Sequence, residues 1–447
     1  MKVAVVGAGY VGLVSGACLS QTGNDVTIAD VDVGRIAMLE AGEMPLYEPG
    51  LEELIARNRE AGRLAFTTDV KAAGARAEVA FLAVGTPSLD DGHVDMRGMY
   101  HAVRQLAAAI RDGIVLAVKS TVPCGTHERV RAILARAGKK RVEYVANPEF
   151  LKEGSAVADF QSPDRIILGI SSERALKVMR HLYAPFMRRS DRMLVMDPAS
   201  AELTKYACNA MLAVRVTFMN EMARLCERVG ADIEQVRRGM GADPRIGHAF
   251  LFPSLGFGGS CLPKDVRALI RMGHIAREPL RIMDAVDRAN REQPDRMFRR
   301  IRAYFRGRLA GKTFAVWGLA FKAKTDDVRE SPALDLVRRL VGAGAAVAAH
   351  DPKAMRTARA VLGDRHIRYA DDSYRALQGA HGLIVCTEWE EYRTPDFGRI
   401  KALLAEPVIF DGRNLYDLAW MAETGIRYIS LGRPPAGQGR PRHGGRP

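Results

Sequence analysis

The sequence predicts two doubly wound α/β domains joined by a central helical domain. Apolar strand-like runs alternate with helix-like runs in the first part of the chain and again from residue 311 onward. From Ala199 to about Arg300 long helical patterns dominate, and strand signals are absent. Strands alternating with helices are typical of parallel sheets covered on both faces. A chain of 447 residues is also too long for one compact core.

The first α/β domain is expected over residues 1–198. It opens with an apolar strand over residues 1–6, a glycine-rich turn and a helix that extends to Gln21. A second strand, DVTIAD, ends at Asp30. Further strands are expected in EVAFLAVGTP, GIVLAVKST and RVEYVANPEF, each followed by loop and helix signals.

The central domain is expected over residues 199–300 and contains one long helix. That helix, over 201–230, is expected to stop at Gly230. Its length and apolar character suit a dimer interface. In the second α/β domain, expected over 301–432, GKTFAVWGLAFK carries a degenerate glycine signature. The helix SPALDLVRRLVGAG and the strands AAVAAHDP, GLIVCTEW and PVIFDG follow it.

The chain is basic, with 66 Lys and Arg against 52 Asp and Glu and a formal net charge of +14. Such a surplus favours anionic partners. The tail 433–447 has four of these charges, no acid and no large apolar residue, so we expect it to be disordered. No nucleic-acid-binding motif is recognisable, and we expect no nucleic-acid partner. The chain start resembles neither a signal peptide nor a membrane span of roughly 20 apolar residues, which favours the cytoplasm.

The start of the chain carries a dinucleotide-binding fingerprint. Gly7, Gly9 and Gly12 form G-x-G-x-x-G directly after the first strand. Such glycines permit a tight turn, a close approach to a pyrophosphate, and close helix packing. Asp30 follows Gly7 by 23 residues, where an acid binds a ribose 2′-hydroxyl and repels a 2′-phosphate. This favours NAD, although Arg35 nearby is suited to accommodate that phosphate.

The segment GFGGSCLPKD, residues 256–265, is the strongest candidate for covalent chemistry. The six cysteines are scattered without a C-x-x-C pair, which indicates neither a disulfide framework nor a metal site. Cys261 lies among glycines that let the backbone pack closely against a ligand, and Lys264 nearby favours a thiolate. A structural cysteine is the alternative. Cys124 in STVPCGT is the rival nucleophile, whereas Cys18, Cys208 and Cys226 fall in helical patterns typical of a core.

Many further segments match the motifs of one known protein family, in the same order along the chain. They are YEPGLEEL, VGTP, KSTVP, NPEFLKEG, ELTKYACNA, DPRIG, GLAFKAKTDDVRES, TEWEEYRTPDF and FDGRN. With the glycine turn and the cysteine segment, they make residues 1 to about 432 resemble the UDP-glucose and GDP-mannose dehydrogenase family. DPRIG and TEWEEYRTPDF favour its UDP-glucose branch. Two positions depart from the family pattern. Phe252 stands where some relatives carry a polar residue that contacts the substrate, and Cys124 stands where a small apolar residue is commoner.

The resemblance implies oxidation of a UDP-glucose alcohol to the carboxylate of UDP-glucuronate by two NAD, for polysaccharide biosynthesis, in a homodimer or higher oligomer. Cys261 would trap the aldehyde as a thiohemiacetal and then hold a thioester. Lys205 would stabilise the alkoxide, and Asn209 would hold the same oxygen or a water. Asp265 would position water or assist proton transfer. Glu149 would serve as acid or base in thioester hydrolysis.

The same resemblance implies two sets of binding residues. The cofactor contacts expected are Gly7, Gly9, Tyr10, Val11, Gly12, Asp30, Arg35, Thr86, Thr121, Glu153, Lys264 and Arg329. The substrate contacts expected are Glu149, Phe150, Leu151, Lys152, Glu153, Lys205, Asn209, Arg245, Phe250, Leu251, Phe252, Pro253, Ser254, Gly258, Lys322 and Arg413.

Three alternatives remain open at this point. The first is another nucleotide-sugar dehydrogenase, with a UDP-hexosamine or GDP-mannose substrate and the same mechanism. The second is an NAD-binding regulatory protein that has lost catalysis, which would predict a missing nucleophile or missing activating residues. The third is a basic nucleic-acid binder. Such a protein would be retained on DNA in a salt-sensitive way, and removal of the tail 433–447 would abolish that retention.

Overall fold

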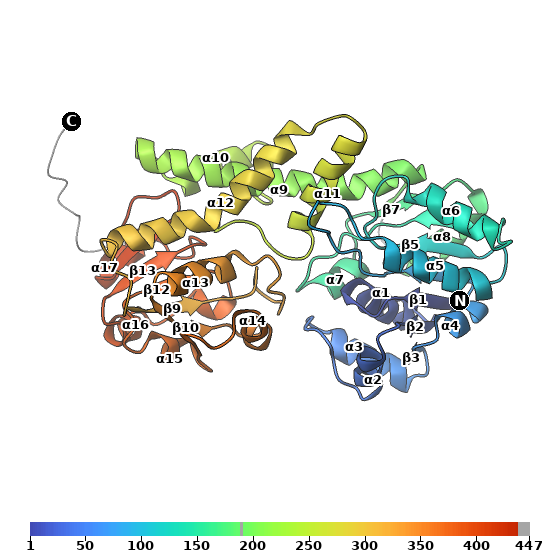
Figure 1. Ribbon diagram of the computed structural model, residues 1–447, viewed down its shortest axis with the longest axis horizontal. Coiled ribbons are helices and arrows are strands. Elements are labelled where there is room, and N and C mark those ends of the chain that lie inside the picture. Colours follow the sequence, from blue (N-terminus) through green and yellow to red (C-terminus); the bar gives the residue numbers. More distant parts are fainter. Residues whose placement is uncertain (188–190, 437–447) are drawn as a thin grey trace. The chain divides into compact units, whose positions relative to one another are not determined.

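The structure is a computed structural model that describes residues 1–187 and 191–436. The chain divides into two compact units. One contains residues 1–208 and 267–279, and the other contains residues 209–266 and the chain from Leu280 onward. Each unit is built around one sheet, as predicted (Figure 1).

The first unit contains a sheet with the order β3-β2-β1-β4-β5-β6-β7-β8. Its strands are β1 (Lys2–Val6), β2 (Asp25–Ala29), β3 (Leu64–Thr67), β4 (Val79–Leu82), β5 (Val115–Val118), β6 (Glu143–Ala146), β7 (Ile166–Gly169) and β8 (Met193–Met196). The helices before the central domain are α1 (Tyr10–Gln21), α2 (Val33–Glu40), α3 (Leu51–Glu60), α4 (Val70–Arg76), α5 (Arg97–Ala109), α6 (Thr126–Arg136), α7 (Ala156–Gln161), α8 (Glu173–Tyr183) and the 3₁₀ turn η1 (Ala184–Phe186).

Successive strand residues point to opposite faces of this sheet, and each face carries its own core. Val3 and Val5 of β1 pack with α1, α3 and α8, whereas Ala4 and Val6 pack with α4, α5 and α6. Burial on both faces explains why these strands are apolar throughout. One pairing departs from the predicted parallel order, because β7 meets β6 in antiparallel orientation.

The central domain is helical, as predicted. Its helices are α9 (Pro198–Val229), α10 (Ile233–Ala242), α11 (Leu262–Ile275) and α12 (Arg281–Tyr304). The long helix α9 ends one residue before Gly230, whose φ of 76° is the left-handed conformation that glycine adopts readily. Among the residues that the structure describes, no helix combines the length and apolar character needed to cross a bilayer.

The second unit contains a parallel sheet with the order β11-β10-β9-β12-β13-β14. Its strands are β9 (Thr313–Trp317), β10 (Ala346–His350), β11 (Ile367–Tyr369), β12 (Leu383–Val385), β13 (Val408–Asp411) and β14 (Arg427–Ser430). Its remaining helical elements are α13 (Pro332–Gly342), α14 (Met355–Leu362), α15 (Ser373–Leu377), η2 (Glu390–Tyr392), α16 (Phe397–Leu403) and α17 (Leu418–Thr424).

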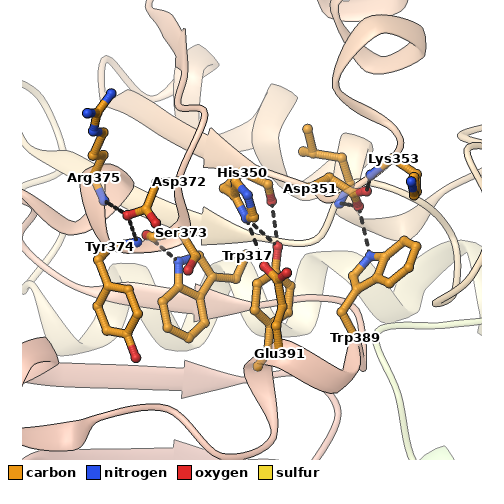
Figure 2. A network of polar contacts seen from close by, with 12 residues as sticks. Trp317, His350, Asp351, Lys353, Asp372, Ser373, Tyr374, Arg375, Trp389 and Glu391 are labelled. Atoms are coloured by element: carbon orange, nitrogen blue, oxygen red, sulfur yellow. Dashed lines mark hydrogen bonds and ion pairs between the residues drawn. The ribbon is translucent and has the colours of Figure 1, made fainter.

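The turn after β9 corresponds to the first glycine turn, but a side chain of the protein binds its backbone amides. Asp351, directly after β10, accepts hydrogen bonds from the amides of Leu319 and Ala320 at 2.7 and 3.0 Å. Figure 2 shows the same carboxylate receiving the indole N–H of Trp389, at 3.2 Å. Asp351 is 2% exposed, so its carboxylate is satisfied within the protein. This turn is therefore a structural variant of the fingerprint.

The predicted start of the disordered tail, at residue 433, is too early in the chain. Arg433 is buried and donates to Ser430 Oγ, the carbonyl of Tyr416 and the hydroxyl of Tyr428 at 3.0, 3.0 and 2.7 Å. Ala436 pairs with Tyr428 through two backbone hydrogen bonds. Ordered structure thus extends through Ala436, because the guanidinium finds buried acceptors that composition does not reveal. The rest of the predicted tail, 437–447, lies outside the described residues.

Candidate active site

The glycine turn of the first unit has the geometry that its sequence predicts. Gly7 has a φ of 109°, and a Cβ there would lie 2.4 Å from the carbonyl oxygen of Ala83. A Cβ on Gly12 would lie 1.8 Å from the carbonyl oxygen of Gly7. Gly9 differs, because a Cβ there would meet no atom within 4 Å. Gly9 therefore leaves open space at the N-terminus of α1, where backbone amides favour a pyrophosphate.

Asp30 directly follows β2, beside this turn. One of its carboxylate oxygens accepts the amide of Ala8 at 2.6 Å, and the other accepts the amide of Asp32 at 3.0 Å. Arg35 lies 3.5 Å from Asp30 and 3.6 Å from Asp32, so its positive charge is shared between two acids. These residues fit the ribose-binding position expected of a dinucleotide, and the acids around Arg35 disfavour an additional phosphate.

Thr86 and Thr121 follow β4 and β5, and the structure brings them together. The Thr86 hydroxyl donates to the carbonyl of Thr121 at 2.8 Å. This is the carboxyl edge of the parallel sheet, where ligands of such folds bind. Lys119, which precedes Thr121 by two residues in KSTVP, is buried beside the rings of Phe160 and Tyr183. Burial lowers the pKa of Lys119 to about 8, and the charge of Glu149 opposes that shift.

Glu149 and Lys205 form a buried ion pair in the first unit. Lys205 Nζ lies 3.0 Å from Glu149 Oε1, and the other carboxylate oxygen accepts the amide of Leu151 at 2.6 Å. Both side chains are almost fully buried, at 5% and 7% exposure. The ring of Phe150 lies 5.2 Å from the same ammonium. An unpaired charge here would carry a large desolvation cost, so each charge compensates the other.

Cys261 directly precedes α11 in the second unit. Its side chain is exposed, and Ser260 Oγ lies 3.5 Å from its sulfur. Its carbonyl accepts the amide of Asp265 at 2.9 Å, which makes it the residue at the helix N-terminus. Helix N-termini carry partial positive charge and favour thiolates. The sequence interpretation placed the cysteine on a tight loop but did not foresee this helix.

The glycines before Cys261 pack against the protein itself. A Cβ on Gly258 would lie 2.3 Å from the carbonyl oxygen of Glu330, and one on Gly259 would lie 2.7 Å from the ring of Phe321. Gly259 also donates its amide to the carbonyl of Arg329 at 2.9 Å. The expected close approach of this backbone to a ligand stays a prediction, because these contacts concern only the Cβ directions. The glycines allow the cysteine loop to lie against the segment that follows β9.

Asn209, Asp265 and Lys264 form a second polar cluster in this unit. Asn209 Nδ2 donates to one oxygen of Asp265 at 2.6 Å, and Lys264 Nζ donates to the other at 2.7 Å. Asp265 is 1% exposed. Lys264 was expected to favour the thiolate, yet its hydrogen bond goes to Asp265. The N-terminus of α11 is a further source of positive potential beside Cys261.

Four of the other cysteines, namely Cys18, Cys124, Cys226 and Cys386, are poorer nucleophiles. Burial raises the pKa of the Cys18 and Cys386 thiols to about 12. Burial also raises the pKa of Cys124 and Cys226, with nearby carboxylates adding to the shift. Cys124, the rival candidate, therefore favours its protonated form, although it is exposed. Because the thiolate is the reactive species, Cys261 is the better candidate.

The expected substrate segment 250–254 is partly exposed and partly structural. Phe250 adopts a φ of 59°, and its ring lies 5.8 Å from that of Phe252, which is 41% exposed. Leu251 and Pro253 are buried. Ser254 is also buried and is bonded internally, since its amide donates to Asn220 Oδ1 at 2.7 Å and its hydroxyl to the carbonyl of Gly256 at 3.2 Å.

Arg413 is an expected substrate cation that the structure holds by an ion pair and a ring contact. Its guanidinium lies over the ring of Phe252, at 5.9 Å, and forms an ion pair with Glu388. Arg413 lowers the pKa of Glu388 against the effect of burial. Lys322 lies 5.4 Å from the ring of Phe321. Arg413 and Phe252 therefore come together in the second unit, from segments far apart in the sequence.

Three further expected cations are engaged with nearby acids. Arg245 pairs with Asp243 at 2.6 Å and Arg329 with Asp327 at 2.7 Å, and both arginines are largely exposed. In the first unit, Lys152 Nζ lies 3.1 Å from Asp159. Exposed pairs of this kind contribute little to stability, so these cations can exchange one anionic partner for another at low cost.

Three charged residues that sequence reasoning passed over lie beside the expected site residues. Lys119 neighbours Thr121, Glu388 holds Arg413, and Glu48 accepts a hydrogen bond from Tyr10. Each stands in a segment already recognised as a family match, namely KSTVP, TEWEEYRTPDF and YEPGLEEL. The signal that could have identified these three residues is a charged side chain that lies in such a segment and has no assigned role.

Comparison with protein families decides the assignment. The NAD binding domain of the UDP-glucose/GDP-mannose dehydrogenase family matches residues 1–187. Its central domain matches residues 199–292, and its UDP binding domain matches residues 315–418. The chain belongs to this family. It is therefore an NAD-dependent oxidoreductase, as its glycine turn and Asp30 predict.

Individual members of the UDP-glucose/GDP-mannose dehydrogenase family resemble the chain over nearly its whole length. The UDP-glucose 6-dehydrogenase of Pseudomonas aeruginosa is 48% identical over 98% of both chains. That of Rhizobium meliloti is 43% identical over 97% of this chain and 100% of the relative. A UDP-glucose dehydrogenase structure from Pyrobaculum islandicum superposes with a TM-score of 0.86, at 40% identity over 92% of this chain and 94% of its own.

A dehydrogenase named for another sugar is also similar in fold. The UDP-D-ManNAc dehydrogenase structure from Pyrococcus horikoshii has a TM-score of 0.85 and 25% identity, over 97% of this chain and 99% of its own. The fold is thus shared between sugar specificities, whereas the sequence identity differs between them. The chain has two parallel-sheet α/β domains with a central helical domain, and its structural neighbours are UDP-sugar dehydrogenases.

Proposed function

We propose that the chain is a UDP-glucose 6-dehydrogenase, which oxidises UDP-glucose to UDP-glucuronate with two molecules of NAD. The observation that carries the proposal is the 48% and 43% identity to enzymes of that name, over nearly complete chains. Identity to the UDP-D-ManNAc enzyme is only 25%. Cys261, Lys205, Asn209 and Asp265 are all present, which argues against a family member that has lost catalysis.

The first oxidation removes a proton and a hydride from the C6 alcohol. NAD supplies the hydride acceptor, and Gly7, Gly9, Gly12 and Asp30 are the residues that suit its pyrophosphate and ribose. The Lys205 ammonium stabilises the developing alkoxide, and Asn209, one helical turn further along α9, holds the same oxygen. Lys205 is held ready for this role by Glu149, 3.0 Å away.

The Cys261 thiolate then attacks the C6 aldehyde, and a carbon–sulfur bond forms as the carbonyl oxygen gains a proton. Loss of a second hydride, to a second NAD, and of that proton, to water, converts the thiohemiacetal into a thioester. Water attacks the thioester, the carbon–sulfur bond breaks, and the carboxylate and the free thiol are released. Glu149 takes the proton of that water, and Asp265 orients it. Covalent trapping keeps the aldehyde from escaping between the two oxidations.

The uridine diphosphate requires cations and an aromatic surface in the second unit. We assign the diphosphate to Arg413 and Lys322, and the neighbouring apolar contact to Phe250 and Phe252. Arg413 is suited to this task because Glu388 and Phe252 already restrict its guanidinium. The other expected contacts, Phe150 to Glu153 in the first unit and Leu251 to Ser254 with Gly258 and Arg245 in the second, remain part of this proposal.

A substrate panel tests the proposal. Purified protein with NAD is expected to form two NADH per UDP-glucose, measured by absorbance, and stoichiometric UDP-glucuronate, measured by chromatography. UDP-N-acetylhexosamines and GDP-mannose are expected to give little turnover. Turnover of one of these sugars without turnover of UDP-glucose would assign a different member of the family.

We also propose that the enzyme is a homodimer or higher oligomer that associates through α9. Three large apolar residues of α9 are exposed at heptad spacing, namely Met211 at 59%, Phe218 at 42% and Leu225 at 53%. Such a stripe on a long helix suits a second copy of the same helix. Isologous pairing would cover the stripe on both chains at once.

The double change Met211→Glu and Leu225→Glu is expected to convert the oligomer into monomers. Light scattering after size-exclusion chromatography measures the mass. Val361→Glu is the matched control, since Val361 of α14 is 52% exposed and lies outside the stripe. An unchanged mass for the double variant at micromolar concentration would exclude α9 as the interface.

We place the enzyme in the cytoplasm, with UDP-glucuronate supplied to polysaccharide biosynthesis. All six cysteines are free thiols, which suits a reducing compartment. Fractionation of cells that express the native protein, followed by detection with an antibody, tests this location.

A further inference from the structure

Glu48 joins three segments of the first unit through one buried carboxylate. It lies in the turn before α3 and is 5% exposed. One oxygen accepts the amide of Gly154 at 2.6 Å and the hydroxyl of Tyr10. The other oxygen accepts the amide of Ala156 at 2.7 Å. These partners lie 106, 38 and 108 residues away in the sequence, so only the folded chain brings them together.

The joined segments are those that carry the cofactor turn and the loop of the expected acids. Tyr10 is the first residue of α1, directly after Gly9. Gly154 ends the NPEFLKEG segment, which carries Glu149 and Glu153, and Ala156 follows it by two residues. Ala156 also begins α7, whose preceding residue makes no side-chain capping hydrogen bond. Glu48 therefore supplies from a distant segment the acceptor that a helix start requires.

A carboxylate is the group that these contacts require. Each oxygen of Glu48 serves a different backbone amide, and both bonds gain strength from the negative charge. The Tyr10 hydroxyl stays a donor, because burial and the neighbouring Glu48 charge raise its pKa well above the ordinary value. A glutamine would present one oxygen and one NH₂ group, and the NH₂ would face a donor. The site thus distinguishes two side chains of nearly equal size.

We propose that Glu48 is a positioning residue that ties the dinucleotide turn to the loop of Glu149 and Glu153. It acts through its partners and touches neither substrate nor cofactor. One part of the inference, the effect on thioester hydrolysis, rests on the function proposed above for Glu149. The other part, the effect on NAD binding, rests on the family's NAD binding domain and on Tyr10 alone.

The proposal is tested with Glu48→Gln, Tyr10→Phe and the control Glu52→Gln, an exposed acid in the first turn of α3. Titration of the enzyme with NAD, without sugar, measures cofactor affinity. We expect Glu48→Gln to weaken NAD binding by about tenfold, since two charge-assisted bonds are disturbed, and Tyr10→Phe by a smaller factor. Glu52→Gln is expected to bind NAD as the unchanged enzyme does.

A second readout follows the covalent intermediate during turnover of UDP-glucose. Glu48→Gln is expected to lower kcat and to accumulate a Cys261 adduct, detected by intact-protein mass spectrometry after acid quench. Tyr10→Phe, which leaves both amides bonded, is expected to keep kcat while the KM for NAD rises. This split separates positioning from a loss of stability, which thermal unfolding reports independently.

Three results overturn the proposal. The first is a folded Glu48→Gln variant with unchanged NAD affinity and kcat, even if its melting temperature falls. The second concerns the case in which Glu48→Gln does not fold. In that case, a Tyr10→Phe variant with unchanged NAD affinity overturns the proposal. The third is weakened NAD binding by Glu52→Gln to the same degree. If the unchanged enzyme binds NAD but does not oxidise UDP-glucose, the proposed function fails while the NAD titrations still decide the role of Glu48.

Discussion

Replacing Cys261 with serine is expected to lower NADH formation from UDP-glucose by about 10³-fold or more, because the covalent path is lost. Cys261 is the exposed cysteine at the N-terminus of α11, where the helix favours a thiolate. A serine hydroxyl at the same place stays protonated at neutral pH and traps an aldehyde poorly. NADH absorbance gives the rate, and intact-protein mass spectrometry shows whether a sugar-nucleotide adduct forms.

Cys124→Ser is the matched control for this prediction. Cys124 is also exposed, but burial of its sulfur and nearby carboxylates raise its pKa. The Cys124 variant is expected to retain the activity and the adduct of the unchanged enzyme. Full conversion of UDP-glucose to its acid by Cys261→Ser at an undiminished rate would refute the thioester mechanism. Loss of the adduct in Cys124→Ser alone would transfer the role to Cys124.

Replacing Lys205 with methionine is expected to affect both stability and rate. Methionine keeps the apolar volume but leaves the Glu149 carboxylate buried at 7% exposure without its cation. Breaking a buried pair in this way costs about 3–5 kcal/mol of folding free energy. Loss of the cation that stabilises the alkoxide is expected to lower kcat by about 10²–10³-fold. Denaturant unfolding and NADH assays measure the two effects separately.

The double variant Lys205→Met with Glu149→Gln separates these two effects. Glutamine removes the buried negative charge, so most of the lost stability is expected to return. The rate is not expected to return, because the electrostatic contribution of Lys205 is still missing. Recovery of kcat together with stability would show that Lys205 acts only by holding the fold. A stable single variant would show instead that the charge of Glu149 is satisfied without Lys205.

The alternation of strands and helices was predictable because it depends on local patterns. Strands β1, β4 and β5 are apolar on both faces, and α9 ends one residue before Gly230, as expected. The antiparallel entry of β7 and the short edge strands were not predicted. Short runs such as Ile367–Tyr369 carry too few residues for a period to be recognised.

The candidate site was predicted as a set of residues but not as a set of contacts. Resemblance to the family identified Lys205, Glu149, Asn209 and Asp265, yet none of their pairings follows from spacing. Lys205 and Glu149 are 56 residues apart, as are Asn209 and Asp265. The expected interaction of Lys264 with the thiolate was a judgement from sequence proximity, and the ammonium instead donates to Asp265.

The sequence by itself determined those features that a single residue type or a short period requires. Gly7 and Gly12 are needed where a Cβ would collide with backbone, so the turn could be recognised without coordinates. The tertiary structure alone decided which buried charges share a partner, as Glu48 shows by joining Tyr10 to the loop of Glu149. The physical reason is that a buried charge requires partners within about 3 Å, and such distances depend on how the whole chain folds.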